Sequence, residues 1–234
     1  MNTFQNYLYG ENKDISEPKN VINISTLSII PNDVMWFRPY LASDFPEIIC
    51  DKKYIFIYCT DHSPAAGQIW WGKGNDINCS DFAEQGIVLT NAYQCESPYL
   101  IRIPEVPGGE TICLYYHTSA SDPTNSGRQQ THLITTTGGV LHTTTWTQRG
   151  TVLGGTEPHT GYLKLYKLGT ANYKGVHLTT GGIPQNYAFS TTTDGVNFVR
   201  GAAYDKTAFL PLNTQYKINT GYMFNKYGKY WYIY

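Results

Sequence analysis

The stretch Glu96-Ser97-Pro98-Tyr99-Leu100 sets a polar residue and a proline in front of apolar, strand-forming residues, and similar stretches recur along the chain. Four phrases follow this polar, Pro/Gly, apolar pattern: Asp44-Phe45-Pro46-Glu47-Ile48, Glu96-Ser97-Pro98-Tyr99-Leu100, His159-Thr160-Gly161-Tyr162-Leu163 and Asn219-Thr220-Gly221-Tyr222-Met223. Their first residues are 52, 63 and 60 positions apart, and an apolar run follows each phrase. A period of this length indicates a repeat protein in which each phrase introduces a pair of strands.

The repeat predicts an all-β fold, a β-propeller made of four-stranded antiparallel blades. Twenty tyrosines, 22 glycines and long threonine tracts favour strands joined by turns. We place complete blades at residues 36–90, 91–153 and 154–212 and a partial blade at 213–234. Residues 1–35 form an arm that either adds a closing strand to the last blade or serves for attachment.

Several strands and one turn can be placed within the blades. The turn is Asp194-Gly195, because Asp and Gly satisfy the backbone angles of a tight hairpin. The expected strands are Gly67–Trp71 and Gly86–Leu89 in the first blade, Gly150–Leu153 in the second, and Tyr187–Ser190 and Val196–Phe198 on either side of the turn in the third.

The fourth segment has room for two strands only. Three complete blades and half of another fall short of the usual closure at about four to eight blades. The run Tyr230–Tyr234 is too aromatic to end in water, so we expect it to pair with a further strand. That strand would come from residues 21–30, from chain downstream or from another subunit, as in a homo-oligomer.

The charge, the N-terminal sequence and the cysteines indicate which binding partners and which cellular compartment to expect. Only 15% of the residues are charged and the net charge is −1, so nothing electrostatic favours nucleic acid or an anionic membrane. Met1–Gly10 has no signal-peptide pattern, and no apolar run suggests a membrane span, which predicts synthesis in the cytosol and release, if any, by another route. Cys50, Cys59 and Cys113 are expected as reduced core residues, whereas pairing of Cys79 with Cys95 stays open.

The segments "DFPEIICDKKYIFIY" and "CESPYLIRIPEVPGGETICLYY" resemble blades of the five-bladed propeller glycosidases of families 43 and 32. "QQTHLITTTGGVLHTTTW" and "YAFSTTTDGVNF" are similar to their outer hairpins, so the resemblance covers roughly residues 36–234. It implies that Asp44 takes the place of the opening general base or nucleophile. Glu96 takes the place of the acid/base glutamate in the Glu-Cys-Pro phrase of family 32.

The chain also departs from these families. Family 43 has an aspartate after the second-blade proline, where this chain has Tyr99, and a third-blade glutamate where the repeat puts His159. Glu157 stands two residues earlier as a substitute acid. In the resembling enzymes a ring histidine helps to hold a central ion or water, but we predict neither a cofactor nor a metal site.

Glycoside hydrolysis needs one carboxylic acid and one carboxylate on either side of the scissile bond. The predicted catalytic residues are therefore Asp44 and Glu96, with Glu157 as substitute acid, and the predicted glycan contacts are Asp61, His62, Tyr99, His159 and Asn219. Aromatic side chains suit this role, since a ring face covers the apolar face of a sugar. The alternative roles of Asp44 and Glu96 are structural, in capping strands or binding turn amides.

Two functions fit the sequence. The first is a carbohydrate-active propeller that binds a glycan and hydrolyses it. The second is a structural or receptor-binding protein, such as part of a viral or phage fibre, that contacts glycans without turnover. The position of Glu157 discriminates between them, because hydrolysis requires it near Asp44 or Glu96.

Overall fold

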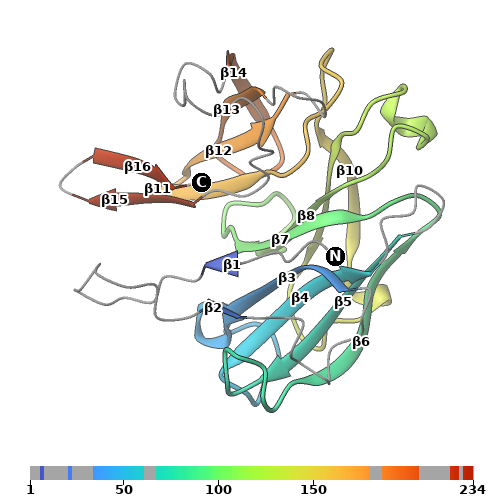
Figure 1. Ribbon diagram of the computed structural model, residues 1–234, viewed down its shortest axis with the longest axis vertical. Coiled ribbons are helices and arrows are strands. Elements are labelled where there is room, and N and C mark those ends of the chain that lie inside the picture. The colour runs from blue at the N-terminus through green and yellow to red at the C-terminus, as the bar shows by residue number, and fades with distance from the viewer. Residues whose placement is uncertain are drawn as a thin grey trace.

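The computed structural model describes residues 6–7, 21–22, 34–60, 67–179, 186–205, 222–226 and 229–233, which fold almost entirely as β-strands (Figure 1). The first sheet contains β3 (Val34–Leu41), β4 (Tyr54–Thr60), β5 (Gly67–Gly74) and β6 (Ala83–Asn91). The second contains β7 (Glu96–Arg102), β8 (Ile112–His117), β9 (Thr131–Thr136) and β10 (Thr147–Leu153). The third contains β11 (Lys164–Gly169), β12 (Asn172–Leu178), β13 (Asn186–Thr192) and β14 (Phe198–Asp205).

Each of these three sheets is an antiparallel meander, in which strands that are neighbours in the chain are neighbours in the sheet. Two further ladders pair β1 (Asn6–Tyr7) with β2 (Val21–Ile22) and β15 (Tyr222–Lys226) with β16 (Lys229–Ile233). The short 3-10 helices η2 (Ala42–Asp44), η3 (Pro123–Asn125) and η4 (Thr143–Thr145) interrupt the loops. The all-β prediction and the four-strand grouping are confirmed, as are the predicted third and fourth strands of the first sheet.

The first strands of the three sheets share one irregularity. β3 and β7 carry a register shift between Met35 and Arg38 and between Glu96 and Tyr99. The residue inside each shift has a left-handed backbone, with φ of 49° at Trp36 and 52° at Ser97. Tyr162, just before β11, has a φ of 60° at the matching position. This bulge is the feature that repeats from sheet to sheet.

The positions of these bulges differ from the repeat register expected from the four phrases. Glu96 begins β7 as predicted, but Asp44 lies in η2, after β3 has ended, so the prediction that Asp44 opens an innermost strand is wrong. The residue that matches Glu96 in the first sheet is Met35, because Met35 pairs with Cys59 as Glu96 pairs with His117. His159 lies two residues before Gly161, which takes that place in the third sheet. Asn219 lies outside the described residues.

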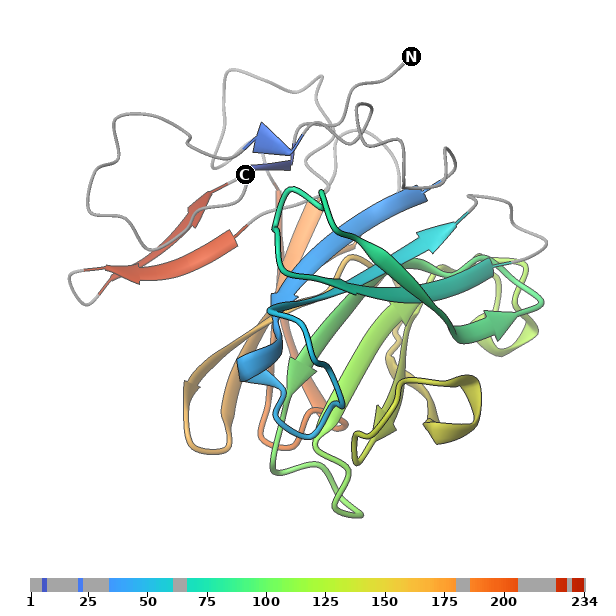
Figure 2. The same cartoon turned by 90° about the horizontal axis from the view of Figure 1, so that it is seen from below.

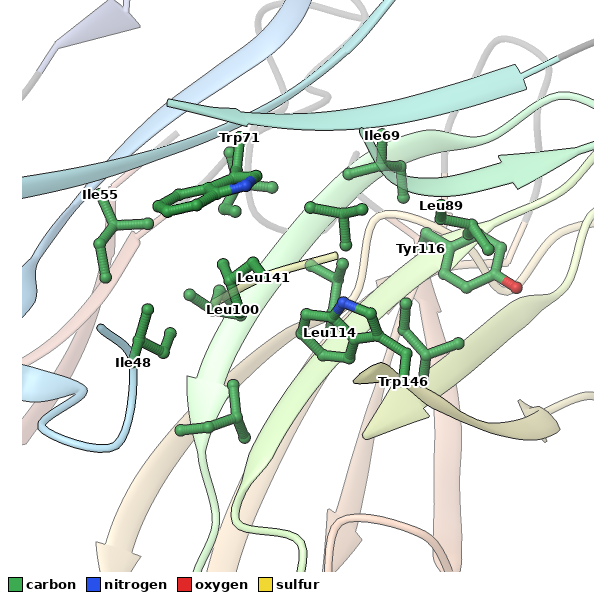
Figure 3. Close-up of a cluster of buried hydrophobic side chains, with 14 of the residues drawn as sticks. Ile48, Ile55, Ile69, Trp71, Leu89, Leu100, Leu114, Tyr116, Leu141 and Trp146 are labelled. Carbon is green, nitrogen blue, oxygen red and sulfur yellow. The ribbon is translucent and has the colours of Figure 1, made fainter. Parts of the chain in front are cut away.

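The second sheet packs between the first and the third, so each pair of neighbouring sheets shares a core (Figure 1). Between the first and second sheets lie Ile55, Ile69, Trp71, Leu100, Leu114 and Trp146, and the loop residues Ile48 and Leu141 join the same core (Figure 3). Leu133, Leu153, Leu163, Leu165 and Tyr173 fill the space between the second and third sheets. Full burial of one such aliphatic or aromatic side chain contributes about 1.5–3 kcal/mol.

The shared cores bring the first strands of the sheets together, as Figure 2 also shows for β3, β7 and β11. The Tyr40 hydroxyl of β3 accepts a hydrogen bond from the Leu100 amide of β7 at 3.0 Å. The Tyr99 hydroxyl of β7 donates to the Leu165 carbonyl of β11 at 2.7 Å. These two hydrogen bonds hold the first strands of the three sheets beside one another.

None of the five cysteines forms a disulfide bond. Cys79 packs in a cluster with Phe37, Phe56 and Tyr58, and Cys95 packs between the first two sheets, so the pairing left open by the sequence does not form. Of the segments described above, none is a helix long and apolar enough to cross a membrane.

Candidate functional site

A polar and aromatic cluster lies where the first strands of the three sheets begin. Trp36 comes from β3, Glu96 from the start of β7, and Tyr162 from the bulge before β11. His117 ends β8 directly opposite Glu96, and His159 precedes Tyr162. We call Trp36, Glu96, His117, His159 and Tyr162 the axial cluster.

Glu96 is the buried carboxylate of the axial cluster, with 1% of the residue exposed. The Tyr162 hydroxyl donates to Glu96 Oε2 at 3.2 Å, and His117 Nε2 lies 3.3 Å from the same oxygen. A buried carboxylate is tolerated only where such polar groups replace water. Burial, and then the negative charge of Glu96, raise the pKa of the Tyr162 hydroxyl, so that hydroxyl stays protonated and remains a donor.

Three other rings pack around Tyr162 beside this carboxylate. The centroid of Tyr162 lies 4.8 Å from that of His117, 5.4 Å from that of His159 and 5.9 Å from that of Trp36. Trp36 and Tyr162 are half-buried, whereas His117 and His159 are fully buried. The accessible parts of the cluster are therefore the edges and faces of two large aromatic rings.

His159 is fixed as a neutral ring. Its Nδ1 accepts a hydrogen bond from the Gly161 amide at 2.8 Å, which leaves the ring proton on Nε2. Burial lowers the pKa of His159 to about 2, with smaller contributions from His117 and His177. Room for this ring exists because residue 161 is glycine: a Cβ there would lie 2.4 Å from His159 Cε1.

The structure does not bring the predicted catalytic carboxylates together. Asp44 is exposed beyond the far end of β3, a strand of 8 residues. At the usual rise per residue that strand is roughly 25 Å long, so Asp44 cannot share a substrate bond with Glu96. Sequence reasoning placed Asp44 at the wrong end because its phrase resembles that of Glu96 in composition, while the backbone bulge that sets the register lies at Trp36.

Glu157 is bound to a strand of the third sheet by an ion pair. Its carboxylate forms an ion pair with Arg200 of β14, and Arg200 also donates to the Gly154 carbonyl at 3.0 Å. Burial acts to raise the pKa of Glu157, but the Arg200 hydrogen bond and charge outweigh it and hold the pKa below its usual value. An ionised glutamate paired in this way is poorly suited to act as a general acid.

Of the five predicted glycan contacts, two lie at or next to the axial cluster and three lie outside the described residues. Tyr99 and His159 lie at or next to the axial cluster, with Tyr99 two residues beyond Ser97 on β7. Asp61 and His62, like Asn219, lie outside the described residues. The sequence analysis missed Trp36, His117 and Tyr162 as site residues, since only the paired bulges of the first strands reveal that they converge.

Within the described ranges, no group of three or more His, Cys, Asp or Glu side chains is arranged to hold a metal ion. Comparison of the sequence with models of known protein families finds no family that matches, and comparison with curated proteins finds no match.

Proposed function

We propose that the three sheets are blades of a β-propeller and that this protein binds a glycan at the axial cluster. Three consecutive four-stranded meanders support the propeller, because each has the same bulged first strand and these first strands lie together. Equivalent positions of a repeat then occupy equivalent places around one axis. In propellers that axis is a central channel.

The observation that carries the binding proposal is the buried Glu96 beside Tyr162 and His117, with Trp36 of β3 and His159 packed against the Tyr162 ring. The half-buried Trp36 and Tyr162 offer apolar ring surface, and the Tyr162 hydroxyl oxygen and the Glu96 carboxylate offer hydrogen-bond acceptors beside it. A sugar presents the complementary combination of apolar C–H faces and hydroxyl groups. Sites for small polar ligands commonly combine aromatic walls with a few fixed polar groups.

Binding without hydrolysis fits the carboxyl groups better than catalysis does. Among the described residues, Glu96 is the one carboxylate in contact with the cluster, because Asp44 lies beyond the far end of β3 and Glu157 is paired with Arg200. Two carboxyl groups at the bond are required in most glycosidases. A receptor-binding or structural role, as in a virion fibre or an extracellular assembly, requires contact with the glycan only.

The test is binding of the full chain to a glycan panel, followed by calorimetric titration of the glycans that bind. Trp36→Ala should weaken binding at least tenfold, about 1.4 kcal/mol, because it removes one aromatic wall. Trp70→Ala is the matched control, since Trp70 is also half-buried but packs against the separate cluster that contains Phe56 and Tyr58. Equal losses for the two variants would contradict the proposed site. Release of reducing sugar that Glu96→Gln abolishes would replace binding with hydrolysis.

A further inference from the structure

A second set of equivalent side chains lies directly beyond the axial cluster. Arg38, Tyr99 and Lys164 hold the same register in β3, β7 and β11, since they pair with Ile57, Tyr115 and Val176 in the second strands. Each of the three comes two residues after the left-handed residue of its sheet. Two residues along a strand correspond to about 6.5 Å. One monosaccharide can span that separation.

Both cations lie within cation–π distance of the Tyr99 ring. The Arg38 guanidinium carbon is 5.9 Å from the Tyr99 ring centroid, and the Lys164 Nζ is 5.3 Å from it. The Tyr99 hydroxyl is tied to the Leu165 carbonyl, so the ring is a fixed support for both cation–π contacts. Three sheets thus hold two positive charges close to one ring.

Neither cation forms an ion pair within the described part of the chain. Arg102, Arg149 and Arg200 each form an ion pair with a glutamate, but no described carboxylate lies within ion-pair distance of Arg38 or Lys164. The Arg38 Nη2 atom is buried without a hydrogen-bond partner, and only 5% of Lys164 is exposed. Buried N–H groups of this kind are nearly always satisfied, and an unpaired buried charge is costly.

We propose that Arg38 and Lys164 bind the carboxylate of an acidic sugar whose ring lies against Trp36 and Tyr162. This inference rests on the proposed function and names its ligand class, a uronic or sialic acid unit. The planar guanidinium matches a carboxylate, and the ammonium supplies a second charge-assisted donor. Glu96 then accepts from a hydroxyl of the same unit, at the level of the aromatic rings.

The experiment measures calorimetric affinities of the full chain for tetragalacturonate, a hyaluronan tetrasaccharide and sialyllactose, each beside its carboxyl-reduced counterpart. At least one acidic ligand should bind tenfold or more tightly than its reduced form, and salt should diminish this preference. Arg38→Gln and Lys164→Gln should each bring the ratio of the two affinities close to one. Lys174→Gln, which removes a lysine 4.5 Å above the Phe189 ring on the third sheet, is the control and should keep the ratio.

The outcomes separate this inference from the proposed function. Equal affinity for acidic and reduced glycans would overturn the acidic ligand and leave glycan binding in place, whereas no binding of any glycan would overturn both. Inorganic phosphate and sulfate are titrated separately. Arg38-dependent binding of these ions without a preference for acidic sugars would overturn the sugar carboxylate in favour of a free anion. If Arg38→Gln does not fold by circular dichroism, Arg38→Lys and Lys164→Gln decide the result.

Discussion

At the residue scale, the buried histidines are the groups whose protonation the fold resists most strongly. Burial lowers the pKa of His159 to about 2, and burial followed by the Arg200 charge lowers the pKa of His177 to about 3. Both rings are engaged as neutral groups, His159 by the Gly161 amide and His177 Nδ1 by the Ser190 hydroxyl at 3.1 Å. In the unfolded chain the histidine pKa is near 6.5, so below that pH the unfolded chain binds protons that the two folded rings do not bind.

This difference predicts a loss of stability in acid. Because both folded pKa values lie below the unfolded value, the stabilisation is complete above about pH 6.5 and declines as the pH falls towards the folded values of about 3 and about 2. His159→Gln should reduce the slope of unfolding free energy against pH by about 1.4 kcal/mol per pH unit below pH 6. Urea unfolding between pH 7 and pH 4 measures this slope. His142→Gln, at an exposed site, is the control, and an unchanged slope in His159→Gln would contradict the assignment.

At the element scale, the β13–β14 turn joins the third sheet to the second. Asp194 Oδ1 accepts hydrogen bonds from the Val196 and Asn197 amides at 2.9 and 2.8 Å, which closes the turn. The Gly195 carbonyl accepts from the buried Tyr115 hydroxyl of β8 at 2.6 Å. One hairpin turn therefore also fixes how two sheets pack.

Gly195→Ala should be more destabilising than Gly127→Ala, although the two glycines have nearly equal φ values of 75° and 76°. A Cβ at residue 195 would lie 2.6 Å from Ile103 Cδ1 and 2.9 Å from the Tyr115 hydroxyl, whereas one at residue 127 would meet nothing within 4 Å. Both variants incur the left-handed backbone cost of about 1–2 kcal/mol, and only Gly195→Ala adds about 1–3 kcal/mol of overpacking. Chemical denaturation measures the difference. Equal free-energy losses would show that the close approach at residue 195 is relieved without cost.

At the scale of the whole molecule, the shared cores make the three sheets one cooperative unit. Leu114 contributes to the core between the first and second sheets, while its neighbour Cys113 contributes to the core between the second and third. Opposite faces of β8 thus support different sheets. We therefore expect loss of packing on either face of β8 to destabilise all three sheets together.

Leu114→Ala should lower the unfolding free energy by about 2–5 kcal/mol, since the residue is fully buried. Hydrogen exchange should then show reduced protection in β12 of the third sheet as well as in β4 of the first. Val199→Ala, at a residue 72% exposed on β14, should change stability by less than about 0.5 kcal/mol. Faster exchange confined to the first sheet would mean that the sheets unfold independently.

The sequence by itself determined the all-β class, the grouping into four-stranded meanders and individual turns, because these depend on local alternation and turn chemistry. Gly67–Trp71 and the Asp194-Gly195 turn were predictable in this way. The sequence also identified Glu96, whose proline-containing phrase begins a strand.

Only the tertiary structure decided which residues surround Glu96. The left-handed bulge at Trp36, Ser97 and Tyr162 sets the register of the first strands. None of these residues is a glycine, the residue type that would indicate a left-handed position in a sequence. The packing of the second sheet between its neighbours then placed Tyr162 beside Glu96 and Trp36 beside Tyr162, and it left Asp44 beyond the far end of β3. Similar composition made the phrases at Asp44 and Glu96 look equivalent, but strand position depends on backbone pairing between distant segments, which composition does not encode.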